Sequence, residues 1–151
     1  MDIFGDTDPR KMPDHLFTGA LFIDYETAVR GNPKKQNFSV CPRNWYVDVD
    51  FKCVECRQEF TWTTSEQKVW FEDYFFWIDS SPKHCKKCGA NRRRLASMRK
   101  EYDSTVRAAR EDGSLKAKTR IVELVTELEL AFGNLPQKML ETKVLFQRQT
   151  E

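Results

Sequence analysis

Apolar and polar residues alternate along WYVDVDF, residues 45–51, with Tyr46, Asp48 and Asp50 on the polar side. A two-residue period predicts a half-buried strand with one apolar and one acidic face. After CVECR, the stretch QEFTWT predicts a second strand that carries Phe60 and Trp62 on one face. The two strands should therefore form a hairpin around the first pair of cysteines.

A short helix is predicted between this hairpin and the second cysteine pair. Thr63 or Thr64 can cap it, with Glu66 or Gln67 at the third helical position. This capping box satisfies backbone amides that lack partners in the first turn. The helix should run from about Ser65 to Tyr74.

Apolar residues recur at three- and four-residue steps after Gly89, which predicts helices in the C-terminal part. The first should end near Gly113, and a second should begin near Ser114 and end at Gly133. A third should follow at once, with Asn134 as its cap and Pro136 in its first turn. The connections are short, so neighbouring helices should pack antiparallel.

The first 42 residues contain four prolines and three glycines and show no sustained period. They predict an irregular arm with one short element around residues 21–29. The composition, 40% hydrophobic and 32% charged over 151 residues, is that of an ordered globular protein. No apolar run approaches the ~20 residues of a membrane span, and the N-terminus lacks the apolar core of a signal peptide. We therefore expect a cytoplasmic protein that does not enter a membrane.

Two CxxC pairs, separated by a 28-residue spacer, are the strongest chemical signal. Each pair places two sulfurs one tight turn apart, so Cys53, Cys56, Cys85 and Cys88 could complete a tetrahedron around one ion. Zinc suits four thiolates, and iron is the alternative from the ligands alone. A closed site leaves no position for a substrate, so the one Zn²⁺ would be structural. Separate redox dithiols and free buried cysteines are the other readings.

Two further residues could bind metal but fit the pattern less well. Cys41 is expected to be a small apolar residue or a free thiol, because the four-cysteine shell is already complete. His15 stands alone in the arm and is expected to be solvated.

The residues WYVDVDFKCVEC, the EQxxWFE pattern at residues 66–72 and HCKKC resemble a family of small bacterial zinc-binding domains of the zinc-ribbon or treble-clef type. The resemblance covers about residues 43–93. It implies a zinc core held by the same four cysteines, and it implies no activity.

Charge is segregated along the chain. Residues 46–79 contain eight acidic and three basic residues, whereas residues 83–100 contain eight basic and no acidic ones. Part of this positive charge can stabilise the thiolates. The remainder could be a solvated face, a surface for phosphates of RNA, DNA or the ribosome, or a surface for an acidic protein. The candidate binding residues are Lys86, Lys87, Arg92, Arg93, Arg94, Arg99 and Lys100.

The aromatic residues between Trp45 and Trp77 are too many for a ribbon of that size to bury. We expect Trp70, Phe71, Tyr74, Phe75 and Trp77 to join the β part to the helices. The alternative is an exposed stacking or protein-binding patch.

No HExxH, GxSxG or P-loop pattern occurs, and no histidine is paired with a nucleophile, so we predict no enzyme and no small-molecule substrate. The predicted fold is α+β. It comprises an irregular arm at 1–42, a zinc-ribbon or treble-clef-like β core with a short inserted helix at 43–93, and three antiparallel helices at 94–151. The function expected is a zinc-binding module that contacts nucleic acid or a ribonucleoprotein. The alternative is an interaction subunit that binds a protein partner or forms a homodimer through its C-terminal helices.

Overall fold

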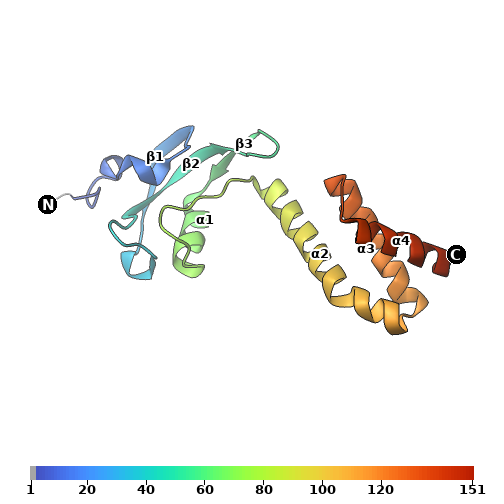
Figure 1. Ribbon diagram of the computed structural model, residues 1–151. Helices are drawn as coiled ribbons and strands as arrows, with labels where there is room; N and C mark the ends of the chain where they lie inside the picture. The colour runs from blue at the N-terminus through green and yellow to red at the C-terminus, as the bar shows by residue number, and fades with distance from the viewer. Residues whose placement is uncertain (1–2) are drawn as a thin grey trace. The chain divides into compact units, whose positions relative to one another are not determined.

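The computed structural model describes residues 3–151, apart from the side chain of Asp112. The chain divides into two compact units, residues 1–88 and residues 89–151. The first contains a small sheet and short helices, and the second is helical (Figure 1). The fold is therefore α+β, as the sequence predicts.

The sheet has three antiparallel strands in the order β1 (Phe22–Arg30), β2 (Trp45–Lys52) and β3 (Glu59–Trp62). Strands β2 and β3 pair from Val49 opposite Trp62 to Lys52 opposite Glu59. The predicted hairpin around the first cysteine pair is confirmed.

Strand β1 coincides with the one short element predicted around residues 21–29 of the otherwise irregular arm. The first two residues of the arm lie outside the described part of the chain. The arm also contains three short 3₁₀ turns, Pro9–Lys11, Asp14–Phe17 and Pro33–Lys35. The β1–β2 register shifts between Asp24 and Val29. At this irregularity the Thr27 hydroxyl takes the place of a backbone partner. It accepts a hydrogen bond from the Asp48 amide at 2.8 Å and donates one to the Asp24 carbonyl at 2.7 Å.

Strand β2 follows the predicted alternation except at one end. Val47, Val49 and Phe51 are buried as expected, but Tyr46, placed on the polar side from the sequence, is also fully buried. Its ring stacks on Phe71, with centroids 6.0 Å apart, and its hydroxyl accepts a hydrogen bond from Gln36 at 2.8 Å. Other segments therefore cover both faces of the strand at this end.

Helix α1 (Thr64–Lys68) starts where the sequence predicts, with the Thr63 hydroxyl accepting the Glu66 amide at 3.3 Å. The predicted single helix then widens into a π-helical turn, Val69–Asp73. The buried Gln67 amide fixes the helix to the sheet by donating to the carbonyls of Val47 and Trp62.

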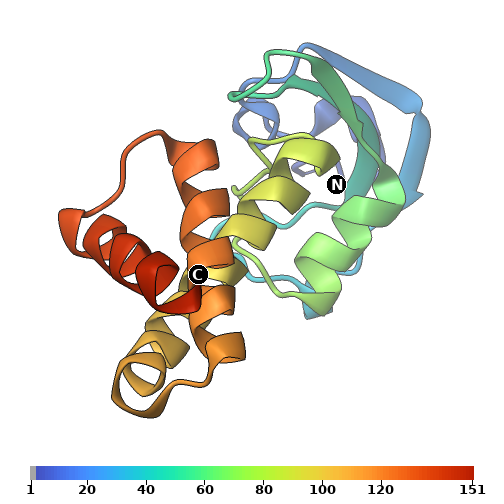
Figure 2. The same cartoon turned by 90° about the vertical axis from the view of Figure 1, so that its right-hand side faces the viewer.

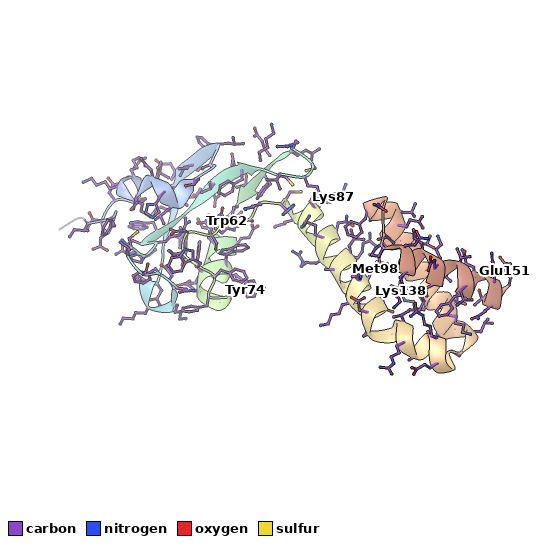
Figure 3. The ribbon with its side chains drawn as sticks, in the orientation of Figure 1. Trp62, Tyr74, Lys87, Met98, Lys138 and Glu151 are labelled. Atoms are coloured by element: carbon purple, nitrogen blue, oxygen red, sulfur yellow. The ribbon has the colours of Figure 1, made fainter. Side chains whose placement is uncertain are left out.

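The hydrophobic core of the first unit lies between the sheet, α1 and the arm. Trp62 lies in it, on the side of the sheet that faces α1 (Figure 3). Its buried members are Met12, Leu16, Phe17, Tyr46, Val47, Val49, Phe51, Trp62, Phe71 and Ile78.

Three helices follow: α2 (Lys86–Asp112), α3 (Leu115–Phe132) and α4 (Gln137–Thr150). The ends of α3 are as predicted, because Ser114 caps its start and Gly133, at φ +71°, closes its end in the left-handed region. The predicted starts of the other two helices were wrong. Helix α2 begins three residues before Gly89, and α4 has Pro136 at its cap position in extended backbone, so Asn134 does not cap it.

Two ion pairs show that α2 and α3 run antiparallel. Arg94 lies 3.7 Å from Glu127, and Arg120 holds Glu101 through two hydrogen bonds of 2.8 and 2.9 Å. Helix α4 packs against α3 (Figure 2). The buried core of this unit consists of Leu95, Tyr102, Ala109, Ile121, Leu124, Val125, Leu128, Met139 and Phe146.

Candidate metal centre

The first cysteine pair lies in the tight turn between β2 and β3. The Cys53 amide donates to the Gln58 carbonyl at 2.9 Å, and the Arg57 amide donates to the Cys53 carbonyl at 3.0 Å. Arg57 adopts a left-handed conformation, φ +64°, that lets the chain reverse. Cys53 is buried and Cys56 is exposed at the tip.

The second pair lies at the start of α2. Cys85 directly precedes the helix, and the Cys88 amide points at the Cys85 sulfur at 3.5 Å. The Val54 amide donates to the Lys83 carbonyl at 3.0 Å, which ties this segment to the β2–β3 turn. The free amides of a helix N-terminus favour negative charge, so this position stabilises thiolates.

All four Sγ atoms lie within 4.8 Å of one another, and Cys56 Sγ and Cys85 Sγ are 3.8 Å apart. Zinc–sulfur bonds of about 2.3 Å in a tetrahedron place the sulfurs about 3.8 Å apart. A disulfide needs about 2.05 Å, so this spacing fits four separate ligands around one ion. The residues predicted as metal ligands are thus brought together, and a structural Zn²⁺ would complete the site.

The pKa values of two of these cysteines shift in opposite directions. Burial raises the pKa of Cys53, but hydrogen bonds from the backbone of Cys56, Cys85 and Glu55 outweigh it and lower that pKa to about 6. A hydrogen bond with Cys85, followed by burial, raises the pKa of Cys88 to about 12. A cation at the centre would remove the remaining protons, because thiolates are the metal-binding form.

Comparison with protein families identifies the fold around this site. Residues 47–96 match the model of a family described as a probable treble clef domain. This segment is a treble clef domain. It covers about a third of the chain and holds both cysteine pairs, β3, α1 and the first turns of α2.

Neither the curated proteins nor the solved structures compared with the chain give a match.

Three of the seven predicted binding residues are engaged in ion pairs. Lys86 contacts Glu66 at 2.8 Å, and this hydrogen bond raises the pKa of Lys86. Arg94 contacts Glu127, and Arg99 contacts Asp103 at 3.2 Å. Among residues 3–151, the other four are exposed and form no ion pair: Lys87, Arg92, Arg93 and Lys100.

Three exposed cations lie on the outward side of α2. Leu95, Tyr102 and Ala109 are buried at seven-residue intervals, and Arg93, Lys100 and Arg107 each precede one of them by two residues. Two residues rotate a helix by about 200°, so the cations lie on nearly the opposite side from the core. Arg107 is held by Glu111 at 3.0 Å. Within residues 3–151, Arg92, Arg93 and Lys100 form no ion pair, and Asp103, the acidic residue three positions after Lys100, pairs with Arg99 at 3.2 Å. We call Arg92, Arg93, Lys100 and Arg107 the basic stripe.

Sequence reasoning missed a cluster around Cys41. The sulfur of Cys41 lies 3.8 Å from His15 Nε2, which in turn lies 3.4 Å from Asp79 Oδ1. Burial, with a contribution from Asp79, raises the pKa of the Cys41 thiol. That shift favours the neutral thiol. Neither residue was expected to be near the other, because nothing in their 26-residue separation signals contact.

The aromatic residues divide between core and surface. Phe71 is buried in the core of the first unit, and Trp70 donates its indole N–H to Ser80 at 2.9 Å. In contrast, Tyr74, Phe75, Phe76 and Trp77 are 42 to 63% exposed. Tyr74 lies at the outer edge of the unit, beyond α1 (Figure 3).

None of the described helices combines the length and the apolar composition needed to cross a membrane.

Proposed function

We propose that this protein is a non-enzymatic zinc-binding module that contacts nucleic acid, alone or in a ribonucleoprotein, through the basic stripe of α2. The observation that carries the proposal is the position of Arg93 and Lys100 opposite the apolar face of the same helix, with Arg92 beside Arg93; all three are exposed and form no ion pair within the described residues.

In this proposal, the metal site of the treble clef domain holds the start of α2 in place. With four sulfurs around one ion, no coordination position remains open for a substrate, so the metal supports structure and not catalysis. It fixes the first residues of α2, since Cys85 and Cys88 flank the start of that helix. The stripe begins one turn later and continues along the same helix.

The side chains of the basic stripe are of the types that bind a phosphate backbone. Arg93, Lys100 and Arg107 are separated by seven residues, or about 10.5 Å of helix rise. Arginine forks and lysine ammonium groups bind phosphate oxygens without reading base sequence. We therefore expect binding that depends strongly on salt and weakly on sequence.

A titration of the full-length, zinc-loaded chain against fluorescent duplex RNA and duplex DNA tests the proposal. Affinity should fall steeply between about 50 and 200 mM salt, because bound cations release counterions from the phosphates. The double variant Arg92→Glu/Arg93→Glu should lose at least about tenfold in affinity and reduce the salt slope by about two.

The matched control is Lys34→Glu/Lys35→Glu, which changes net charge equally at two exposed lysines of the 3₁₀ turn at Pro33–Lys35. It should bind as the wild type does. Equal losses in both variants would show that net charge, not the stripe, is responsible. No binding at low salt would reject the proposal.

A second candidate function, a protein-interaction subunit, is favoured by a separate observation. Leu130 of α3 is 78% exposed, and Phe132, next to its end cap, is 58% exposed. Contiguous exposed apolar surface often marks a protein contact. Light scattering that reports a stable complex, together with no nucleic-acid binding, would favour this candidate.

A further inference from the structure

Helix α4 has a second apolar side that the core of its unit does not use. Met139 and Phe146 are buried against α3, whereas Val144 and Leu145 are 45% and 48% exposed. The exposed side lines a shallow groove of about 280 Å³. Its lining residues are Gln137, Leu140, Glu141, Val144, Leu145 and Arg148.

Two opposite charges flank the apolar centre of this groove. Glu141 and Arg148 are seven residues apart, about two turns, so they lie on the same side of the helix. Within residues 3–151 Arg148 forms no ion pair, and Glu141 has one side-chain partner, the Gln137 amide, at 3.3 Å. The pattern is thus acidic, apolar, basic along one line.

We propose that this groove is a dimer interface, in which α4 packs antiparallel against α4 of a second copy of the chain. A two-fold axis between Val144 and Leu145 brings these apolar residues of both copies together. Glu141 and Arg148 lie equally far from that axis along the helix, so Glu141 of each copy comes opposite Arg148 of the other. The proposal does not depend on nucleic-acid binding.

Charge complementarity selects this occupant and this orientation. In an isologous contact, a two-fold axis relates the two copies, so every contact occurs twice. Glu141 of each copy can therefore pair with Arg148 of the other at the same time. A parallel arrangement would place Glu141 beside Glu141 and Arg148 beside Arg148, which is repulsive. The apolar centre would supply most of the affinity, and the charges would set the orientation.

Charge reversal of the full-length, zinc-loaded chain tests the proposal, with sedimentation or light scattering as the readout. The wild type should show a concentration-dependent monomer–dimer equilibrium. Glu141→Arg and Arg148→Glu should each weaken dimerisation by roughly tenfold or more, because both pairs become repulsive. An equimolar mixture of the two variants should form a heterodimer at least as tight as the wild type, because every pair is then attractive.

The double variant Glu141→Arg/Arg148→Glu should also dimerise as the wild type does, since it exchanges the charges within one chain. Val144→Asp should abolish the dimer. Lys138→Glu is the matched control, because Lys138 is exposed on the same helix and lies outside the groove lining; it should have little effect (Figure 3). Thermal melting of each variant verifies its fold.

Three outcomes would overturn the proposal. One is a wild type that stays monomeric up to the highest soluble concentration. Another is a dimer that survives Val144→Asp or either single reversal. The third is a mixture of the two reversed variants that fails to associate.

Discussion

Arg43 is the residue on which three distant segments of the first unit converge. It is 1% exposed, its Nε donates to the Ile78 carbonyl at 3.0 Å, and its Nη2 donates to the Leu16 carbonyl at 2.7 Å. The guanidinium also lies 4.7 Å from the centroid of Phe71. Burial lowers the pKa of Arg43 to about 10. A buried cation of this kind is retained only because carbonyls and ring faces replace its water.

Replacing Arg43 with lysine should lower the free energy of unfolding by about 2 kcal/mol. A lysine keeps the charge but has neither the planar fork nor the stacking surface, so at least one buried carbonyl loses its partner. Urea denaturation followed by tryptophan fluorescence measures the change. Arg10→Lys, at an exposed ion pair with Glu26, is the control and should change stability little. Equal stability of Arg43→Lys and wild type would contradict this role.

At the scale of elements, the Arg120–Glu101 ion pair is one of the contacts that hold α2 and α3 antiparallel. The Arg120 guanidinium holds both carboxylate oxygens of Glu101, and this hydrogen bonding lowers the pKa of Glu101 below its ordinary value of 4.5. A carboxyl whose pKa is lower in the folded state stabilises the fold above its unfolded pKa. That contribution is lost as the pH falls through the folded value.

The thermal stability of the helical unit should therefore fall as the pH drops below about 4.5, in part because Glu101 is protonated. In Glu101→Gln this part of the pH dependence should be absent, although the variant starts less stable at pH 7. Melting curves of both proteins between pH 7 and pH 3, followed by circular dichroism at the helix band, provide the measurement. Parallel pH profiles of the two proteins would mean that the Glu101–Arg120 ion pair contributes nothing to this pH dependence.

For the molecule as a whole, the metal site and the first hydrophobic core are separate sources of order. None of the four cysteines belongs to the buried cluster built on Tyr46, Trp62 and Phe71. Each unit also has a core of its own. Loss of the metal should therefore act locally and not unfold the chain.

Chelation of the zinc-loaded protein should raise hydrogen exchange at residues 53–58 and 83–90. Strands β1 and β2 and helix α3 should keep their protection, because their cores contain no cysteine ligand. Exchange followed by mass spectrometry resolves these segments, and Cys85→Ser should reproduce the chelated pattern. Loss of protection across the whole sheet would show that the metal supports the entire unit.

The sequence by itself determined the local features of this protein. Spacing indicated the four ligands, alternation indicated the β2–β3 hairpin, and Ser114 and Gly133 indicated the ends of α3. The hairpin and helix-end signals depend on residues that are close together in the chain. The cysteine signal depends on spacing, because two CxxC pairs have few roles other than binding a metal. In the arm, the sequence indicated one short element around residues 21–29, where β1 lies, but it did not indicate the antiparallel pairing of β1 with β2, which joins residues far apart in the chain.

Only the tertiary structure decided which polar groups are buried and which charges are free. It buried Tyr46 and Arg43, brought His15 to Cys41, and paired Lys86 with Glu66 while leaving Arg93 exposed. Such contacts join residues far apart in sequence, and their energies depend on the solvent and partners that packing removes or supplies. A local pattern carries no information about those neighbours.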